Sequence, residues 1–397
     1  MSKAPGYALH LSWASMSKPL RERVLYQLGN VIFQLSGLRF HRIGSLFEGK
    51  DGPLVNESLS RGFVVHDRYL LDEVARGPFT SASEYYAALV SMLREHASCL
   101  RLSPRCLLAP CPLPEEYDTD KHFKEAYDRW HDFVRLGSKL DSSANRMDYV
   151  VVSDLLAEMR KEWVEATYPE EEKQHIFTLH HPDLSVNNIF VDECGNITCI
   201  IDWAFCSSVP LSLTLTAPGL PQSRHEISEE LFTALKLGFL SSALGTDVTL
   251  KGEIQRCRIL ERSRPMWLLS RLLSFDTMND YHVLQDLWTC VRGQPEEALL
   301  EEIDSRRCSD IYSELITELR EDYDIPNGAA EANGFHNRSE TDLTISKKLT
   351  MVSQWPIRYT LPNAPGLRKY GTPFIADKRA WRWISMYALA VGDHYQT

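Results

Sequence analysis

Residues 175–210 read HIFTLHHPDLSVNNIFVDECGNITCIIDWAFCSSVP, and within them the hydrophobic pattern of the chain changes from helical to β. Residues 189–191 and 197–201 are rich in β-branched and other apolar residues, and a polar turn sequence separates them. Gly195 and Asn196 in that turn tolerate the positive φ that a tight connection requires. The stretch therefore predicts a small antiparallel hairpin over about residues 189–201.

Four polar residues are placed around this predicted hairpin. His181, Asp183 and Asn188 fit the pattern H-x-D-x-x-x-x-N directly before its first strand, and Asp202 follows its second strand. The pattern involves only three residues, so a chance match in a chain of this length has a probability of about a few per cent. These side chains could also do no more than cap turns. The apolar strands on both sides of the pattern favour a functional loop.

These residue types suit the transfer of a phosphoryl group to a hydroxyl. The hydroxyl needs a carboxylate that orients it and accepts its proton, and Asp183 is the candidate for this base. Mg²⁺ takes one or two oxygen ligands from the protein and the rest from phosphates and water, so Asn188 and Asp202 are candidate ligands that we expect to lie close together. We expect His181 to hold the loop through hydrogen bonds to the backbone.

The segment resembles the catalytic region of the aminoglycoside phosphotransferase and choline kinase-like superfamily. In that superfamily I-D-W or I-D-F replaces the D-F-G of protein kinases, and residues 201–203 here are Ile-Asp-Trp. Further stretches are similar to a fungal branch of the family, namely residues 38–40, 43–46, 76–79 and 217–224. The resemblance covers roughly residues 10–320. It implies a protein-kinase-like C-terminal lobe and an ATP- and Mg²⁺-dependent transfer of the γ-phosphoryl group to a hydroxyl of a small molecule, with the acceptor left open.

Helical periodicity dominates outside the hairpin, which predicts an α+β fold that is predominantly α-helical, without a sheet of five or more strands. The first long helix follows Ser17 as its N-cap, and Ser81 with Glu84 forms a capping-box signature. The expected helices cover residues 17–38, from 81 onward, 121–136, 154–166, 228–244, 254–273, 281–291 and 295–319.

The composition divides the chain into four parts. Residues 17–323 are expected to form the kinase-like helical lobe, and residues 324–344 are polar and rich in Gly and Asn, as in a linker. Residues 345–397 form a tail, and residues 1–16 are expected to be the remnant of a segment between two lobes.

A kinase of this type grips ATP with a Gly-rich loop and a Lys on a neighbouring strand, and neither is recognisable here. Because these groups supply much of the positioning and charge neutralisation, we expect weak ATP binding and turnover far below the about 1 to 100 s⁻¹ of typical kinases. Two alternatives to an active enzyme follow. The chain could be a non-catalytic binding or interaction protein, or it could come from an incomplete gene model.

Charge and composition exclude several function classes. The 397 residues include 43 basic and 54 acidic ones, a net charge of −11 that offers no footprint for nucleic acid or an anionic membrane. Nine scattered cysteines and the lack of a signal-peptide pattern predict a reducing, cytoplasmic location. A small-molecule hydroxyl compound is the expected partner, and the oligomeric state stays open.

Overall fold

The computed structural model describes residues 4–50, 52–100, 102, 109–111, 117–124, 143–173, 175–222, 225–244, 250–275, 280–321 and 372–374. The predicted linker at 324–344 lies outside the described residues. So do the tail at 345–397, apart from 372–374, and most of the expected helix at 121–136.

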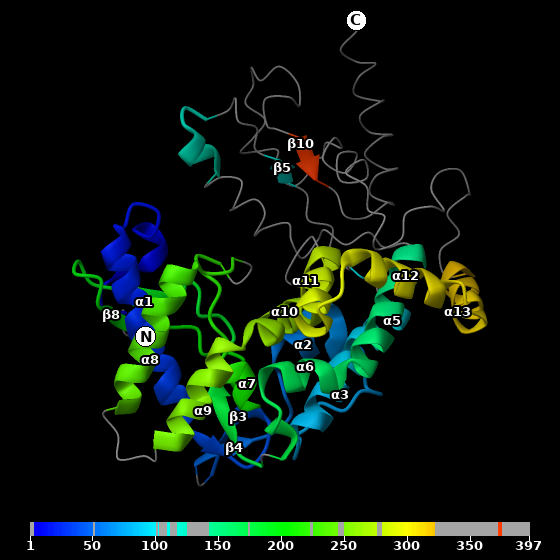
Figure 1. Ribbon diagram of the computed structural model, residues 1–397, viewed down its shortest axis with the longest axis horizontal. Helices are drawn as coiled ribbons and strands as arrows, with labels where there is room; N and C mark the ends of the chain where they lie inside the picture. The colour runs from blue at the N-terminus through cyan, green and yellow to red at the C-terminus, as the bar shows by residue number, and fades with distance from the viewer. Residues whose placement is uncertain are drawn as a thin grey trace, which may run out of the picture.

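One hydrophobic core forms around α1 (Lys18–Gly37) and α8 (Glu229–Leu244), which lie side by side in Figure 1. Helix α1 begins after Ser17, as predicted, with a proline in its first turn where a missing N–H costs nothing. Apolar residues of α1 recur on one face and are buried against α8 and α9 (Leu250–Glu261).

Two glycines allow α1 and α8 to approach closely. A Cβ added to Gly29 in α1 would overlap the carbonyl oxygen of Leu235 in α8. A Cβ added to Gly238 in α8 would overlap the carbonyl oxygen of Tyr26 in α1. The two backbones are therefore in direct contact at this crossing, and only glycine fits on either side.

The second hydrophobic core lies among the remaining long helices. The capping box at the start of α3 is present in part, because Ser81 Oγ accepts a hydrogen bond from Glu84 N at 3.2 Å, while the Glu84 carboxylate accepts one from Thr80 N at 3.1 Å. The helices of this core are α3 (Ala82–Cys99), α5 (Ser143–Glu158), α6 (Arg160–Thr167), α10 (Arg264–Leu273), α11 (Asp280–Arg292), α12 (Glu296–Arg307) and α13 (Asp310–Glu321).

Three predicted helices are each divided in the structure. The region 154–166 contains the end of α5 and most of α6, with a break at residue 159. The region 254–273 contains the end of α9 and all of α10, with a break at residues 262–263. The region 295–319 contains α12 and most of α13, with a break at residues 308–309. Apolar periodicity continues across such a break, so a single-sequence pattern does not detect it.

The predicted hairpin is confirmed as β7 (Ile189–Val191) and β8 (Ile197–Ile200), which pair antiparallel. Gly195 has a φ of 74°, as expected for its place in the turn. The side chain of Gln27 on α1 holds this turn, since its Nε2 donates to Gly195 O at 2.8 Å and its Oε1 accepts from Ile197 N at 2.9 Å. A short strand, β1 (Tyr7–Ala8), adds a third member next to β7.

The expectation that the chain has no sheet of five or more strands is wrong. A five-stranded sheet has the order β2-β6-β9-β3-β4, and each adjacent pair is antiparallel. Its strands are two to six residues long, too short for alternation to stand out from the surrounding helical pattern. They are β2 (Arg39–Phe40), β3 (Gly44–Gly49), β4 (Gly52–Val55), β6 (Phe177–His180) and β9 (Ser207–Val209).

The chain therefore has a mixed α+β fold with antiparallel sheets and a high helical content. A further strand pair joins β5 (Ala109–Cys111) to β10 (Thr372–Phe374). Within the described residues, no helix combines the length and apolar character needed to cross a bilayer. For the candidate site, the important feature is that β6 leads out of one core and β7 leads into the other.

Candidate active site

The loop between β6 and β7 is organised around the imidazole of His181. Its Nδ1 accepts a hydrogen bond from Asp183 N at 3.1 Å, which makes Nε2 the N–H that donates to Ile201 O at 3.0 Å. His181 is 2% exposed, and the edge of its ring meets Trp203 with centroids 4.7 Å apart. The expected hydrogen bonds from His181 to the backbone are thus present, and they join the loop to the end of the hairpin.

Asn188 closes the loop from its other end. Its Nδ2 donates to both Asp183 O at 3.0 Å and Asp183 Oδ2 at 3.1 Å. Its carbonyl oxygen accepts from Ile201 N at 2.9 Å, which continues the β7–β8 pairing by one step. The structure therefore brings the predicted base and one predicted metal ligand into direct contact.

Asp202 is the second residue after the end of β8 and is exposed. Its φ of 61° lies in the left-handed region, which a non-glycine residue occupies at a cost and which is enriched at functional sites. Burial lowers the pKa of His181, while its hydrogen bond to Ile201 O and the negative charges of Asp183 and Asp202 oppose that shift. The expectation that Asn188 and Asp202 share a cation stays a prediction.

A three-residue metal cluster is absent from the described part of the chain. No group of three or more His, Cys, Asp or Glu side chains there is arranged to hold a metal ion. The proposed Mg²⁺ site has only one amide and one carboxylate, which is fewer than three such side chains. Mg²⁺ can bind such a pair because phosphates and water supply its other ligands.

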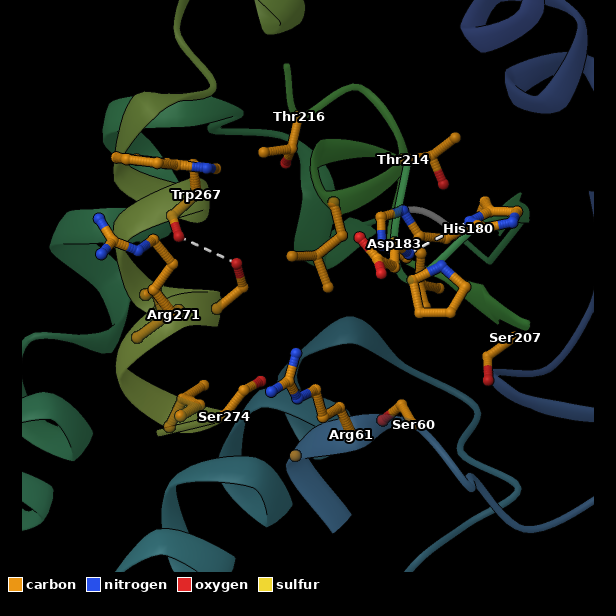
Figure 2. A pocket seen from close by; sticks show the side chains of 18 of the residues that line it. Ser60, Arg61, His180, Asp183, Ser207, Thr214, Thr216, Trp267, Arg271 and Ser274 are labelled. Atoms are coloured by element: carbon orange, nitrogen blue, oxygen red, sulfur yellow. Dashed lines mark hydrogen bonds between the residues drawn. The ribbon is translucent and has the colours of Figure 1, made fainter. Parts of the chain in front are cut away.

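A cavity of about 170 Å³ opens beside Asp183, several times the about 30 Å³ that one water molecule occupies in the liquid. Figure 2 shows Asp183 and His180 on one side, which we call the loop wall. On the opposite side α10 presents Trp267, Arg271 and, at its C-cap, Ser274. Asp183 lines this space and accepts a hydrogen bond from Asn188, whereas neither Asn188 nor Asp202 lines it.

Two short segments complete the cavity. Ser60 and Arg61, at the start of α2 (Arg61–Val64), line it between the loop wall and α10, and the Arg61 guanidinium extends into the space. Thr214, at the end of α7 (Leu211–Thr214), and Thr216 line it from the other side. We call Arg61, Trp267, Arg271 and Ser274 the distal wall, because they line the side of the cavity opposite the loop wall. The Arg61 guanidinium points into the cavity, whereas the Arg271 guanidinium lies beside the Trp267 ring on the side of α10 that faces away from Asp183 (Figure 2).

Sequence reasoning missed the distal wall. Trp267 and Arg271 are one helical turn apart on α10, and the Arg271 guanidinium stacks on the Trp267 ring at 4.6 Å from its centroid. The spacing of Trp267 and Arg271, four residues apart in a predicted helix, indicates in the sequence that the two side chains can contact each other. Nothing in the spacing of residues linked it to Asp183, 84 positions earlier in the chain.

Arg68, in η2 (Val65–Leu70), holds the backbone of the distal wall from behind. It is fully buried, and its Nη1 donates to Gly62 O and to Leu273 O, each at 2.6 Å. Its Nε donates to His96 Nδ1 at 3.1 Å. Burial lowers the pKa of Arg68 to about 9, which still leaves it charged at neutral pH. One buried cation thus ties the segment after Arg61 to the C-terminal end of α10.

The histidines of the loop wall are neutral at pH 7. Burial and, to a smaller extent, the charge of the neighbouring His181 together lower the pKa of His180 to about 4. Arg61, Arg271 and Asp183 therefore carry the formal charges of the cavity lining within the described part of the chain.

No protein-family model, curated protein or solved structure matches the chain. The function of the site is therefore inferred from the residues and geometry described above.

Proposed function

We propose that the chain is an ATP- and Mg²⁺-dependent phosphotransferase that resembles the aminoglycoside phosphotransferase family and transfers the γ-phosphoryl group to a hydroxyl of a small molecule. The observation that carries the proposal is the position of Asp183. It lines the cavity on one side and accepts a hydrogen bond from Asn188 on the other. A general base in phosphoryl transfer has to contact the acceptor hydroxyl and lie close to the residues that hold the nucleotide and its metal ion.

Asp183 is proposed as the base. An acceptor hydroxyl in the cavity would donate a hydrogen bond to the carboxylate, which orients the oxygen and takes its proton as the oxygen bonds to the γ-phosphorus and the bond from that phosphorus to the leaving ADP breaks. Asn188 Nδ2 fixes the carboxylate through Oδ2, so the other oxygen is the one that can receive the proton. His181 positions the loop by its hydrogen bonds and takes no part in the proton transfer.

Asn188 and Asp202 are proposed to hold Mg²⁺. Both offer oxygen, the ligand atom that this ion prefers, and Nδ2 of Asn188 is the donor to Asp183, so Oδ1 is the atom that would bind the cation. Because Asp202 is exposed, an ion bound to its carboxylate could take its remaining ligands from water and phosphate. The metal would neutralise charge on the phosphate oxygens during transfer.

The order of elements supports a kinase-like lobe as part of the proposal. A strand, β6, leads into the loop with Asp183, the loop leads into the hairpin β7–β8, and the hairpin ends at Ile201-Asp202-Trp203. A backbone hydrogen bond from Ile201 N to Asn188 O keeps the loop and the end of the hairpin together.

The test uses the full chain with Mg²⁺, ATP labelled in the γ-phosphate, and a pooled panel of sugars, polyols and amino alcohols. We expect Asp183→Asn to lower transfer by about 10² to 10⁴-fold while ATP binding persists, since a general base contributes that much. Asp202→Ala should abolish Mg²⁺-dependent ATP binding in calorimetry. Asp286→Asn, an exposed acid on α11, is the matched control and should behave as wild type.

Two results would contradict the proposal. One is ATP binding that does not depend on Mg²⁺ or Asp202. The other is a wild-type chain that binds small molecules in the cavity but transfers no phosphate, which would favour the non-catalytic binding protein.

A further inference from the structure

The charge of the cavity is opposite to that of the protein. The chain has a net charge of −11, yet the cavity is lined by two arginines and one carboxylate within the described residues. The carboxylate, Asp183, is the proposed base and sits on the loop wall. Both arginines belong to the distal wall. An acceptor that fills the cavity would therefore present its hydroxyl to the acid and its far end to the cations.

Arg61 is the cation best placed to contact such an acceptor. Its guanidinium extends into the space between the loop wall and α10, with the hydroxyl groups of Ser60 and Ser274 on either side of it (Figure 2). A guanidinium has five N–H donors in a planar fork, so it can bind two oxygens of an oxyanion in addition to contacts within the protein. The Arg271 guanidinium is stacked on Trp267 and lies farther from Asp183, so Arg61 is the cation that would contact the acceptor.

The backbone beside Arg61 is held in place before any ligand binds. Gly62 O, the carbonyl of the next residue, accepts a hydrogen bond from buried Arg68, which also binds Leu273 O at the end of α10. The site is therefore pre-organised, and less ordering is needed when an anion binds.

We propose that the acceptor is a hydroxyl compound that also carries an anionic group, a carboxylate or a phosphate ester, and that Arg61 binds this group while the hydroxyl faces Asp183. That the bound molecule is a phosphoryl acceptor rests on the proposed phosphotransfer. That Arg61 binds an anion in the cavity does not depend on phosphotransfer. Cationic amines would place a positive charge against the arginines of the distal wall and are disfavoured by the same geometry.

The experiment measures thermal unfolding and calorimetric binding of the full chain without ATP or Mg²⁺, in a buffer free of phosphate at constant ionic strength. Matched probes differ in one group: glycerol against glycerate and glycerol 3-phosphate, and glucose against gluconate and glucose 6-phosphate. Choline and an aminoglycoside represent amines, and inorganic phosphate tests the oxyanion alone. The carboxylate and phosphate-ester arms distinguish the two sources of negative charge.

We expect at least one anionic probe to bind about tenfold more tightly than its uncharged partner, because a hydrogen bond to a charged group contributes about one factor of ten or more. Arg61→Gln should remove that preference, and Arg61→Lys should restore part of it. Arg42→Gln removes an exposed arginine outside the cavity and should leave the preference unchanged.

Tighter binding of amines than of anions would overturn the proposal, and so would the lack of any anion preference that depends on Arg61. Because neither ATP nor Mg²⁺ is present, a failure of phosphotransfer in the Asp183 experiment would leave this result unchanged. Conversely, transfer to an uncharged or cationic acceptor in preference to its anionic counterpart would overturn the assignment of the acceptor as an anionic compound and keep the phosphotransferase.

Discussion

The two walls of the cavity are held by different kinds of contact. In the loop wall, Asp183 is bound by His181 and Asn188, which lie two and five residues away in the sequence. In the distal wall, Arg68 reaches Leu273, which lies 205 residues away. The proposed catalytic residues are therefore held by neighbours in the sequence, whereas the wall that would recognise a substrate is assembled from distant parts of the chain.

The largest effect in this comparison is expected from Arg68→Met, which removes the long-range connection. Gly62 O, Leu273 O and His96 Nδ1 would each lose a donor in a buried environment, and an unsatisfied buried group costs about 1 to 3 kcal/mol. We expect the free energy of unfolding to fall by about 3 kcal/mol, measured by urea denaturation.

Arg264→Met provides the control for this substitution. Arg264 is partly exposed and pairs with Glu226 at 2.7 Å, so its loss should change the free energy of unfolding by less than about 1 kcal/mol. Equal effects of the two substitutions would show that the distal wall does not depend on Arg68.

A smaller effect is expected from the loop wall when the pH falls. The folded-state pKa of His180 is about 4, below its ordinary value of 6.5, so between these values the unfolded chain binds more protons than the folded one. The stability linked to His180 is therefore complete above about pH 6.5 and is lost as the pH falls toward about 4, by at most about 1.4 kcal/mol per pH unit. Urea denaturation at pH 7 and pH 5 should show a smaller loss in His180→Gln than in wild type. An identical loss in both chains would argue that His180 is not buried as a neutral group.

The smallest effect tests a local contact that the sequence itself reveals. Ser81→Ala removes the hydrogen bond to Glu84 N at the start of α3, a helix whose Tyr85, Tyr86 and Leu89 line the cavity. We expect a loss of about 1 kcal/mol in the free energy of unfolding, without a change in the affinity for ligands. Ser83→Ala in the same helical turn is the control, and it should cost less than Ser81→Ala.

These contacts also explain how much could be predicted from the sequence. The hairpin at residues 189–200 and the starts of α1 after Ser17 and of α3 after Ser81 depend on neighbours within a few residues, so local patterns indicated them. The five-stranded sheet could not be predicted, because β6 and β9 pair with strands more than 130 residues earlier and contribute only three or four residues each.

The distal wall was missed for a related reason. Arg61 and Arg271 are ordinary charged residues on helices, where the usual expectation is a solvated surface. Only the fold shows that both line a cavity beside Asp183. Net charge gave no indication of it, since an acidic protein has a cavity lined by more arginines than acids within its described residues.

The crossing of α1 and α8 has a consequence in genetic terms. Every missense change that one nucleotide can make in a glycine codon adds a Cβ, and at Gly29 or Gly238 that atom would overlap a carbonyl oxygen of the facing helix. These two codons therefore have no mild substitutions available, whereas Gly37 at the end of α1 has open space around it and can mutate freely. Because Ile32 and Leu35 on α1 also line the cavity, a change at either codon would reach the site through a shifted helix. Selection on a function of the cavity should thus leave its clearest mark on two residues that do not line it.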